Sequence, residues 1–375
     1  MKIVLTGGGT GGHFYPLIAI AEELAKEARE NKLLDAKLYY MAPTPYHEAR
    51  LFDNDITFVK IPAGKKRIYS SVLNVFDWFV MGWGILIALW KMFTIFPDVV
   101  FAKGGYASYP ALFAARFFGI PVVIHESDSV PGRVNLWAGK FAKKIALSYP
   151  AAADYFPKDK TAYTGNPVRR ELLIVQKSGG HEFLKLEDTT PVILILGGSL
   201  GSEIINDIII DSLPILITKY QIIHQTGKAN YMEILNTAKV ILKDNEFEHR
   251  YHPFDYLNDL AMQMSAGVAD LVISRAGSTI FEIAVWGIPA ILIPITDSNG
   301  DHQRKNAYAY ARSGAGVIIE EANLNANILI EEIKRLMENH AEREKMKAAA
   351  KGFARLDAAE VIAKEIIQIG LGHEK

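Results

Sequence analysis

The sequence predicts an α/β fold with two domains, each built around a parallel β-sheet. Three observations predict it. The length of 375 residues suits two domains of ordinary size. Short, continuous apolar runs are typical of strands buried on both faces, and the helical patterns between them imply parallel strand–helix–strand units. Half of the residues are hydrophobic and 22% are charged, which excludes wholesale disorder.

The expected strands are apolar, β-branched runs bounded by Gly or Pro. In chain order they are Lys2–Thr6, Lys37–Met41, Thr57–Ile61, Asp98–Ala102, Pro121–His125, Lys144–Ser148, Pro191–Leu196, Tyr220–Gln225, Asp270–Ser274, Pro289–Pro294 and Gly316–Glu320. A helix is expected over Pro16–Glu30, where apolar residues recur at helical spacing.

Two glycine-rich segments, Thr6–His13 and Leu196–Glu203, each end a strand and open a helix. We therefore expect two Rossmann-like domains, 1–167 and 168–352, although chance similarity of glycine-rich turns is the alternative. The boundary is expected near Gly165–Arg169, where Asn-Pro interrupts local order. Glu171–Thr190 is expected to be a loosely packed connection.

The first loop matches the dinucleotide pattern Gly7-x-Gly9-x-x-Gly12, which lets the backbone and a helix N-terminus approach a phosphate. A nicotinamide site also needs an acidic residue ending the second strand. Tyr39–Pro43 holds none, and no P-loop motif occurs. Two such loops on facing domains favour a sugar diphosphate, and glycines serving only close packing are the alternative.

Three further segments carry candidate polar groups. His13 opens the first helix, where the helix dipole disfavours a positive imidazole, so a neutral ring can accept a proton; a capping role is the alternative. Glu282 follows a strand and can bond both hydroxyls of a ribose, or merely complement a helix dipole. Asp301–Ala307 is a polar segment that decides nothing alone.

Composition and missing motifs exclude several classes. There is no cysteine, which rules out disulfides and thiolate catalysis. Lys and Arg number 41 against 42 Asp and Glu, so no global basic field indicates nucleic acid. No metal-ligand pattern and no Gly-x-Ser-x-Gly elbow occur. Because Met1–Thr6 runs directly into glycines without a long apolar stretch, we expect no signal peptide.

Taken together, the motifs resemble the MurG family of peptidoglycan glycosyltransferases. The motifs that carry the resemblance follow one another in the family's order: Gly8–His13 with Pro16, Gly104–Tyr106, His125-Glu126, Gly165–Arg169, Gly197–Ser199, Ser274–Gly277, Asp301–Gln303 and Asn306-Ala307. The resemblance implies a GT-B fold, two Rossmann-like domains facing across a cleft, with a C-terminal helix at about 353–375 packing back on the first domain. It also implies an inverting transfer without metal or cofactor.

The implied substrates are UDP-N-acetylglucosamine and a polyprenyl-diphosphate-linked muramoyl-peptide acceptor, with lipid II as the product of this step of cell-wall synthesis. The family pattern assigns the acceptor side to Thr10, Gly11, Gly12 and His13. His13 is the candidate general base, and Glu126 and Asp128 are in reserve. The donor side is assigned to a larger set of matching positions. They are Arg169 and Ser199 at the diphosphate, the backbone around Asp255 at the uracil, Glu282 at the ribose, Gln303 at the sugar hydroxyls, and Ser278 and Thr279, which the shorter segment assigns to no particular group.

Three departures from the family pattern are visible. Asp128 stands for the usual asparagine, Leu200 stands for the usual glutamine, and Gly277–Glu282 is one residue shorter than usual. The alternatives are another GT-B lipid glycosyltransferase, a nucleotide-sugar epimerase, or a non-catalytic protein that binds a nucleotide sugar.

Three of the five tryptophans cluster in one apolar helix, together with Ile87: Trp78, Trp83 and Trp90. The unbroken apolar run is shorter than the ~20 residues that cross a bilayer. Tryptophan favours the membrane interface. The basic residues just upstream can meet anionic lipid; they are Lys60, Lys65, Lys66 and Arg67. We expect peripheral contact with the cytoplasmic face of the cell membrane, and burial against the sheet is the alternative.

Overall fold

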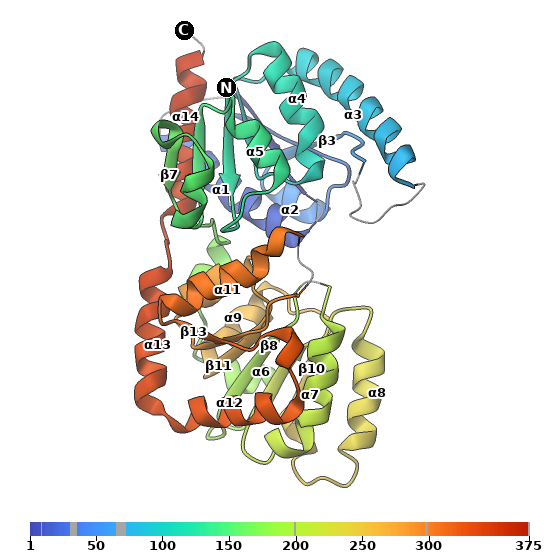
Figure 1. Cartoon of the computed structure of the whole chain (residues 1–375), viewed down its shortest axis with the longest axis vertical. Coiled ribbons are helices and arrows are strands. Elements are labelled where there is room, and N and C mark those ends of the chain that lie inside the picture. Colours follow the sequence, from blue (N-terminus) through green and yellow to red (C-terminus); the bar gives the residue numbers. More distant parts are fainter. Residues whose placement is uncertain (9, 31–35, 65–72, 199, 297–298, 374–375) are drawn as a thin grey trace. The chain divides into compact units, whose positions relative to one another are not determined.

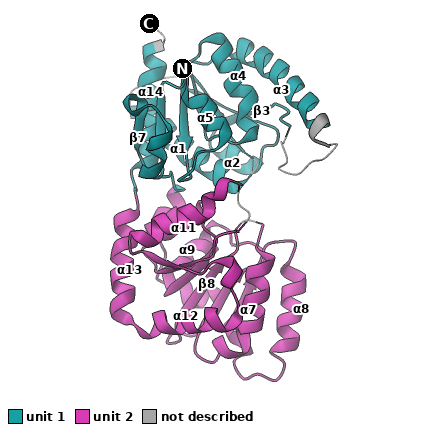
Figure 2. Ribbon diagram, in the orientation of Figure 1, with its two compact units in different colours: residues 1–169, 355–375 teal, residues 170–354 magenta. Residues whose placement is uncertain are grey.

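The computed structural model describes the chain apart from residues 9, 31–35, 65–72, 199, 297–298 and 374–375. The chain divides into two compact units (Figures 1 and 2): unit 1 is residues 1–169 with 355–375, and unit 2 is residues 170–354. Each unit holds one sheet in which every strand pair is parallel. The predicted α/β fold with two parallel sheets is confirmed.

The sheet of unit 1 has the strand order β3-β2-β1-β4-β5-β6-β7. Its strands are β1 Lys2–Thr6, β2 Lys37–Ala42, β3 Ile56–Lys60, β4 Val99–Ala102, β5 Val122–Glu126, β6 Lys144–Leu147 and β7 Thr161–Tyr163. Its helices are α1 Gly11–Glu30, α2 Glu48–Asp53, α3 Leu73–Ile95, α4 Tyr109–Phe118, α5 Arg133–Gly139 and α14 Ala358–His373. Strand order reverses between β1 and β4, the point at which open α/β sheets bind ligands.

The sheet of unit 2 repeats this order as β10-β9-β8-β11-β12-β13. Its strands are β8 Val192–Leu196, β9 Gln221–Gln225, β10 Tyr251–Phe254, β11 Leu271–Ser274, β12 Ala290–Leu292 and β13 Gly316–Ile318. Its helices are α6 Gly180–Leu184, α7 Glu203–Leu216, α8 Tyr231–Ile241, α9 Asp259–Val268, α10 Thr279–Trp286, α11 His302–Arg312, α12 Ala326–Glu338 and α13 His340–Phe353. The reversal here lies between β8 and β11.

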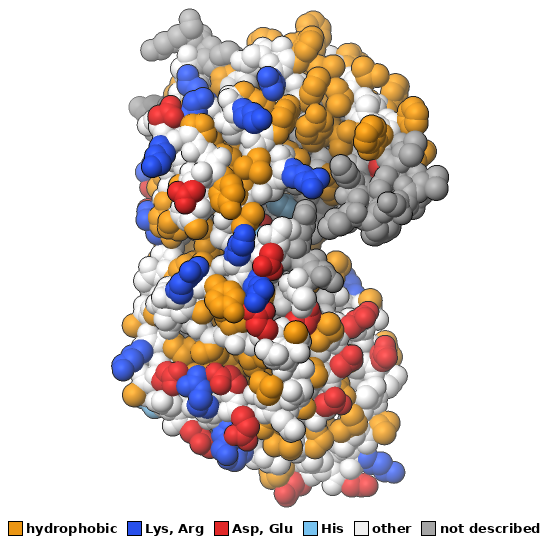
Figure 3. Space-filling view, in the orientation of Figure 1, with side chains coloured by type: hydrophobic (Ala, Val, Ile, Leu, Met, Phe, Trp, Pro, Cys, Tyr) orange, Lys and Arg blue, Asp and Glu red, His pale blue; other side chains and the backbone are white. Residues whose placement is uncertain are grey.

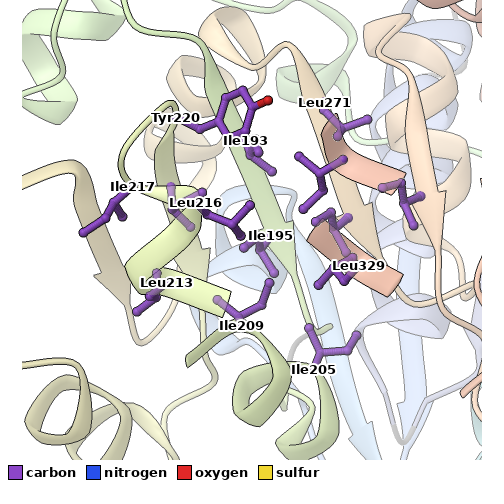
Figure 4. Packing of buried hydrophobic residues seen from close by; sticks show 14 of the residues in the cluster. Ile193, Ile195, Ile205, Ile209, Leu213, Leu216, Ile217, Tyr220, Leu271 and Leu329 are labelled. Carbon is purple, nitrogen blue, oxygen red and sulfur yellow. The ribbon is translucent and has the colours of Figure 1, made fainter. Parts of the chain in front are cut away.

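Each sheet is covered by apolar side chains that the helices supply. In unit 1, side chains of α1 and α14 form one apolar cluster with the strands, and side chains of α3 and α4 form a second cluster with them. In unit 2, α7 and α12 cover β8 and β11, and Figure 4 shows Ile193, Ile195 and Leu271 of the strands meeting Ile209 and Leu329 of the helices. Burying both faces of the strands explains why their sequences are continuously apolar.

The connection that was expected to be loosely packed is exposed at half of its residues and anchored at a few points. Within Glu171–Thr190, the side chains of Leu172 and Leu184 are buried, and the Trp286 indole N–H donates to the Leu172 carbonyl (3.1 Å). The expectation fails only at these anchoring residues, because a short segment can bury single leucines without a periodic pattern. Two short strands, β7 and β10, were not predicted from the sequence.

Candidate functional site

The first glycine-rich loop joins β1 to α1 and requires glycine at its start. Gly7 and Gly8 have φ values of +154° and +148°. A Cβ on Gly8 would lie 2.9 Å from the hydroxyl oxygen of Tyr40, and that hydroxyl donates to the Gly7 carbonyl (2.8 Å). The described first turn of α1, from Gly11 onward, holds no acidic side chain. The N-terminal amides and the dipole of α1 therefore suit an incoming anion.

The residues predicted for the acceptor side lie together at this N-terminus. Thr10 is exposed, Gly11 is buried, and Gly12 and His13 are half-buried. The Thr10 carbonyl accepts the His13 N–H (3.2 Å), and the Thr10 hydroxyl lies 3.2 Å from His13 Nδ1. A Cβ on Gly105 would lie 3.7 and 3.8 Å from His13 Cε1 and Nε2. The imidazole thus lies beside the Gly105 backbone, and glycine is favoured at this position by its φ of +77°.

Glu126 ends β5 with its side chain buried and fully engaged. One carboxylate oxygen accepts the Asp128 N–H (3.0 Å), and the other accepts the Gly132 N–H (3.0 Å) and the Asn135 amide (2.9 Å). Burial and the neighbouring Asp128 raise the pKa of Glu126 to about 7, and these hydrogen bonds oppose the rise. The reserve base is thereby also the group that shapes the loop carrying half-buried Asp128.

A buried cation lies behind this loop, and no role was predicted for it from the sequence. Lys103 follows β4 directly and is 1% exposed. Its Nζ lies 2.5 Å from His125 Nδ1 and donates to the Asn166 side-chain oxygen (2.8 Å). The sequence does place this lysine at the end of a continuously apolar strand, immediately before Gly104. Because buried lysines almost always have partners, that position could have indicated a polar cluster.

Arg169 was expected in the C-terminal domain, but it is the last residue of the first segment of unit 1. Its side chain is buried, with the guanidinium carbon 4.1 Å from the centre of the Tyr15 ring. Tyr15 belongs to the first turns of α1, so this cation lies beside the helix that carries His13. The first segment of unit 1 therefore ends two residues after the expected domain boundary at residue 167.

The second glycine-rich loop joins β8 to α7 in unit 2. Ser199 lies outside the described residues. Gly201 has a φ of +81°, and a Cβ there would lie 2.0 Å from the Thr226 carbonyl oxygen, so the loop lies directly on the segment after β9. Ser202 caps α7, its hydroxyl accepting the Ile205 N–H (3.4 Å). Leu200, which stands where the family usually has glutamine, is 82% exposed.

Arg275 ties the loops at the carboxyl edge of this sheet together. It follows β11 directly, and its guanidinium donates to the Ser202 hydroxyl (2.7 and 3.1 Å) and to the Ile293 carbonyl (3.1 Å). It also pairs with Glu321 (2.7 Å), whose other oxygen accepts the Thr296 N–H (2.8 Å). The guanidinium, paired with Glu321, thus lies at the N-terminus of α7, the place where an anionic group is favoured.

The remaining donor-side residues follow neighbouring strands of unit 2. Ser278 precedes α10, Thr279 begins it, and Glu282 lies half-buried in its first turn. Gln303 lies in the first turn of α11, and its side-chain oxygen accepts the Ile295 N–H (3.3 Å). Because carboxyl ends of parallel strands share one edge, these residues belong to the same edge as Arg275.

Asp255 follows β10 and is exposed, with its carboxylate accepting the Tyr256 N–H (2.7 Å). The preceding Phe254 carbonyl accepts the backbone N–H (2.9 Å) and the hydroxyl (3.1 Å) of Thr226. This carbonyl is committed to its own unit, so a backbone contact to a base would come from the exposed residues that follow it.

The tryptophan helix α3 has one narrow face against unit 1 and one broad exposed face. Gly84, Ala88 and Met92 are buried, and a Cβ on Gly84 would lie 1.9 Å from the Pro62 carbonyl oxygen. The large exposed side chains are Phe76, Trp78, Phe79, Trp83, Leu86, Trp90 and Phe93, and Ile87 is half-buried. Figure 3 shows hydrophobic side chains gathered over α3 and α4.

By length and composition alone, one helical stretch of the described chain is apolar enough to cross a membrane. It is Phe76–Ile95, with a mean hydropathy of 1.6 and 17% of its most apolar window buried. Among the described residues, no group of three or more His, Asp or Glu side chains is placed to hold a metal ion.

Comparison with known proteins decides the family. The glycosyltransferase family 28 N-terminal domain matches residues 3–147, and the family 28 C-terminal domain matches residues 192–362. A crystal structure of MurG from Acinetobacter baumannii is 25% identical, with a TM-score of 0.71 over 98% of this chain and 99% of that chain. The chain belongs to the MurG family of glycosyltransferases. The predicted resemblance and the GT-B class of fold are confirmed.

Two relatives match this chain over most of its length and of their own. Both are named UDP-N-acetylglucosamine–N-acetylmuramyl-(pentapeptide) pyrophosphoryl-undecaprenol N-acetylglucosamine transferase; the Bacillus cereus protein carries the number 2. It is 36% identical over 97% of this chain and 99% of its own length, and the Clostridium novyi protein is 37% identical over 89% and 90%. A putative UDP-N-acetylglucosamine 2-epimerase from Listeria monocytogenes shares the fold, with a TM-score of 0.72, at 16% identity.

Proposed function

We propose that this MurG-family enzyme transfers N-acetylglucosamine from UDP-N-acetylglucosamine to the undecaprenyl-diphosphate-linked muramoyl-pentapeptide, giving lipid II. The observation that carries the proposal is the match, over nearly the whole chain, to relatives named for this transfer. The carboxyl edges of the two sheets support the proposal. In unit 1 the His13 imidazole lies at the N-terminus of α1, and in unit 2 the buried Arg275 lies at the N-terminus of α7.

The proposed chemistry is a single displacement with inversion. An acceptor hydroxyl oxygen forms a bond to C1 of the sugar while the bond from C1 to the UDP β-phosphate oxygen breaks. UDP leaves with the electron pair, and the hydroxyl proton passes to His13. If Nδ1 carries the hydrogen and donates to the Thr10 hydroxyl, 3.2 Å away, the ring lone pair is on Nε2, the nitrogen that lies against Gly105.

The donor is proposed to bind at the edge of unit 2. The charge that develops on the departing diphosphate is stabilised by the N-terminus of α7 and by Arg275, which holds the Ser202 cap in place. Glu282 is proposed to accept bonds from the ribose hydroxyls and Gln303 to contact the sugar. A guanidinium and helix dipoles supply this stabilisation, so we propose that no divalent ion is required.

The membrane is proposed to meet the exposed face of α3. Trp78, Trp83 and Trp90 are 60–71% exposed, whereas the small side of the same helix is buried against its own unit. A helix with one face committed to the protein lies in the interface rather than across the bilayer. Exposed Lys60 lies upstream, and Lys65, Lys66 and Arg67 lie outside the described residues. The proposed location is the cytoplasmic face of the membrane, where a polyprenyl acceptor is anchored.

UDP release tests the transfer. Purified protein is given UDP-N-acetylglucosamine with a lipid I analogue, and UDP and the glycosylated lipid are measured, with and without EDTA. We expect both products in equal amounts and no loss with EDTA. Donor binding without UDP release would overturn the transferase assignment. Formation of UDP-N-acetylmannosamine, or of N-acetylmannosamine together with UDP, in the absence of acceptor would identify an epimerase. Loss with EDTA would overturn only the metal independence.

Vesicle flotation tests the membrane proposal separately. Binding to vesicles containing phosphatidylglycerol is compared between the wild type and a Trp83→Ser, Trp90→Ser double variant. We expect the double variant to lose most of the binding, because burial of each aromatic side chain contributes about 2 kcal/mol. Phe52→Ser is the matched control, since Phe52 is 84% exposed on α2 of the same unit. Undiminished binding of the double variant would remove α3 from the membrane contact.

A further inference from the structure

Lys103 contacts the loop that leads to His13, at Thr6 and Gly7, and directly precedes the Gly104-Gly105 turn beside the His13 ring. Its backbone N–H donates to the Thr6 carbonyl (2.9 Å), at the end of β1. A Cβ on Gly7 would lie 2.9 Å from Lys103 Cβ, so the loop leading to His13 rests directly on the lysine stem. Two residues after Lys103, Gly105 forms the surface against which the imidazole lies. A shift of Lys103 therefore moves both the Gly7 loop that precedes His13 and the Gly105 backbone beside its ring.

The buried ammonium fixes Lys103 to two further segments. Its Nζ contacts His125 Nδ1 on β5 and the Asn166 side-chain oxygen after β7. An ammonium only donates, so His125 Nδ1 accepts, and the ring hydrogen is on Nε2. From Nε2, the ring donates to the Gly165 carbonyl (3.0 Å). One lysine and one histidine thus connect the ends of β4 and β5 with the Gly165-Asn166 segment.

The turn after Lys103 is held from its other side as well. A Cβ on Gly104 would lie 2.6–2.8 Å from the Asn135 amide group and would have to displace it, and the φ of +84° at this position also favours glycine. The Asn135 amide donates to the carbonyl of His125 and to the Glu126 carboxylate. His125 is therefore clamped through its ring by Lys103 and through its backbone by Asn135, and the turn lies between the two.

We propose that Lys103 is a positioning residue for the transfer reaction: through His125 and Asn166 it fixes the Gly104-Gly105 turn, and so the place at which His13 meets the acceptor hydroxyl. The inference rests on the proposed role of His13. It extends that role to a lysine that touches no substrate, because Lys103 is almost completely buried.

The charges around Lys103 give the arrangement a pH dependence. Burial lowers the pKa of Lys103 to about 7, while the Glu126 and Asp128 carboxylates favour its charged form. Burial, the Lys103 ammonium and nearby His13 all lower the pKa of His125, against the effect of its bond to Gly165. His125 therefore stays neutral. Loss of the Lys103 proton near neutral pH leaves an amine with two hydrogens, enough for both contacts, but it removes the positive charge that faces Glu126 and Asp128 and so weakens the hold on this cluster.

Lys103→Met tests the proposal, because methionine keeps the length of the stem and removes the donor. We expect kcat/KM for the lipid I analogue to fall about tenfold or more, since a misplacement of about 1 Å can cost on the order of 100-fold in rate. UDP affinity, measured by calorimetry, should stay within about twofold. The variant should also lose the change in acceptor kcat/KM that titration of Lys103 produces near pH 7 in the wild type.

Two variants distinguish positioning from general loss of packing. Ser148→Ala removes a hydroxyl that lies 3.2 Å from His125 Nε2 and leaves both Lys103 contacts in place, so it should retain near-wild-type kcat/KM. Lys103→Gln keeps an amide that can donate hydrogen bonds, on a shorter stem, and we expect it to recover part of the activity lost in Lys103→Met. Equal losses in Ser148→Ala and Lys103→Met would overturn the proposal.

Nitrogen-15 spectra of the wild-type histidines test the contact without any activity. His125, assigned with a His125→Asn variant, should show the Nε2–H tautomer at neutral pH, and Lys103→Met should change both its tautomer ratio and the resonances of His13. A wild-type Nδ1–H tautomer would overturn the inference even if no Lys103 variant folds. An inactive wild type with the expected tautomer would instead contradict the proposed transferase function.

Discussion

The two units place different cations at the same point of the same topology. Lys103 follows β4 and Arg275 follows β11, one residue after Ala102 pairs with Thr6 and Ser274 pairs with Leu196. Lys103 is bonded to neutral groups, and its pKa falls to about 7. Arg275 is instead paired with a carboxylate, that of Glu321.

This difference separates two chemical tasks. Unit 1 gathers groups that gain or lose a proton near neutral pH, with the pKa of Glu126 raised to about 7 by burial and Asp128. In unit 2 the buried His224 is held neutral, its pKa lowered to about 3 by burial, and the buried cation after β11 is a guanidinium held in an ion pair with Glu321. We infer that unit 1 is suited to moving a proton and unit 2 to holding an anion.

His13→Ala should produce the largest effect, and it should be confined to catalysis. Removing a general base costs about 100-fold or more in kcat. UDP affinity should be unchanged, because His13 belongs to unit 1 and the donor is assigned to unit 2. Steady-state kinetics with the lipid I analogue and calorimetry with UDP check both. His340→Ala, an exposed histidine on α13, is the control. A turnover within a few-fold of the wild type would assign the base elsewhere.

Glu282→Ala should affect the other task. A hydrogen bond to a charged group contributes roughly 1.5–3 kcal/mol, so donor KM and the UDP dissociation constant should rise about tenfold or more. Acceptor KM should change little. Glu233→Ala is the matched control, because Glu233 is exposed in the first turn of α8 in the same unit. An unchanged UDP affinity would remove Glu282 from the ribose.

Ser202→Ala tests whether the arginine cluster also stabilises unit 2. The variant removes the α7 cap, which typically contributes about 1 kcal/mol, and one acceptor of Arg275. We expect a loss of about 1 kcal/mol in urea unfolding and a weaker affinity for UDP. Exposed Thr189→Ala should remain within about 0.5 kcal/mol of the wild type. Full stability with normal UDP affinity would show that Glu321 and Ile293 alone hold Arg275.

The parts of the fold predictable from sequence are those with a strong local pattern. The runs at β1 and β8 were identified because both faces are buried, and the loops after them were identified by their glycines. β10 was missed because Tyr251–Phe254 contains a histidine and a proline and is only partly buried. Its pairing with β9 comes from the sheet, not from its own sequence.

The site divides in the same way. His13 and Glu282 follow directly from their places after strands, which the sequence displays. Lys103 could not be given a role, because its partners His125 and Asn166 are 22 and 63 residues away along the chain. Arg275 likewise depends on Ser202 and Glu321, 73 and 46 residues away. Long-range polar clusters leave no period in the sequence, so only the fold brings them together.

The smallest expected effect concerns the response of the two units to acid. The hydrogen bond from Arg250, with those from Thr190 and His249, lowers the pKa of Glu187 to about 2. A carboxyl with a lowered pKa stabilises the folded state above its ordinary pKa, near 4.5, and this stabilisation is lost as the pH falls toward 2. Glu126, with its raised pKa, has the opposite sign: its contribution becomes unfavourable as the pH rises from 4.5 to 7.

Glu187→Gln should therefore cost less than about 1 kcal/mol at pH 7, because the carboxylate is partly exposed and solvent screens the pair. The difference from the wild type should shrink as the pH falls from 4.5 and disappear near pH 2. Urea unfolding at a series of pH values measures it, with Asp188→Asn, an exposed neighbour, as the control. A difference that stayed constant with pH would mean that the loss comes from packing, and the acid sensitivity of unit 2 would then lie outside this cluster.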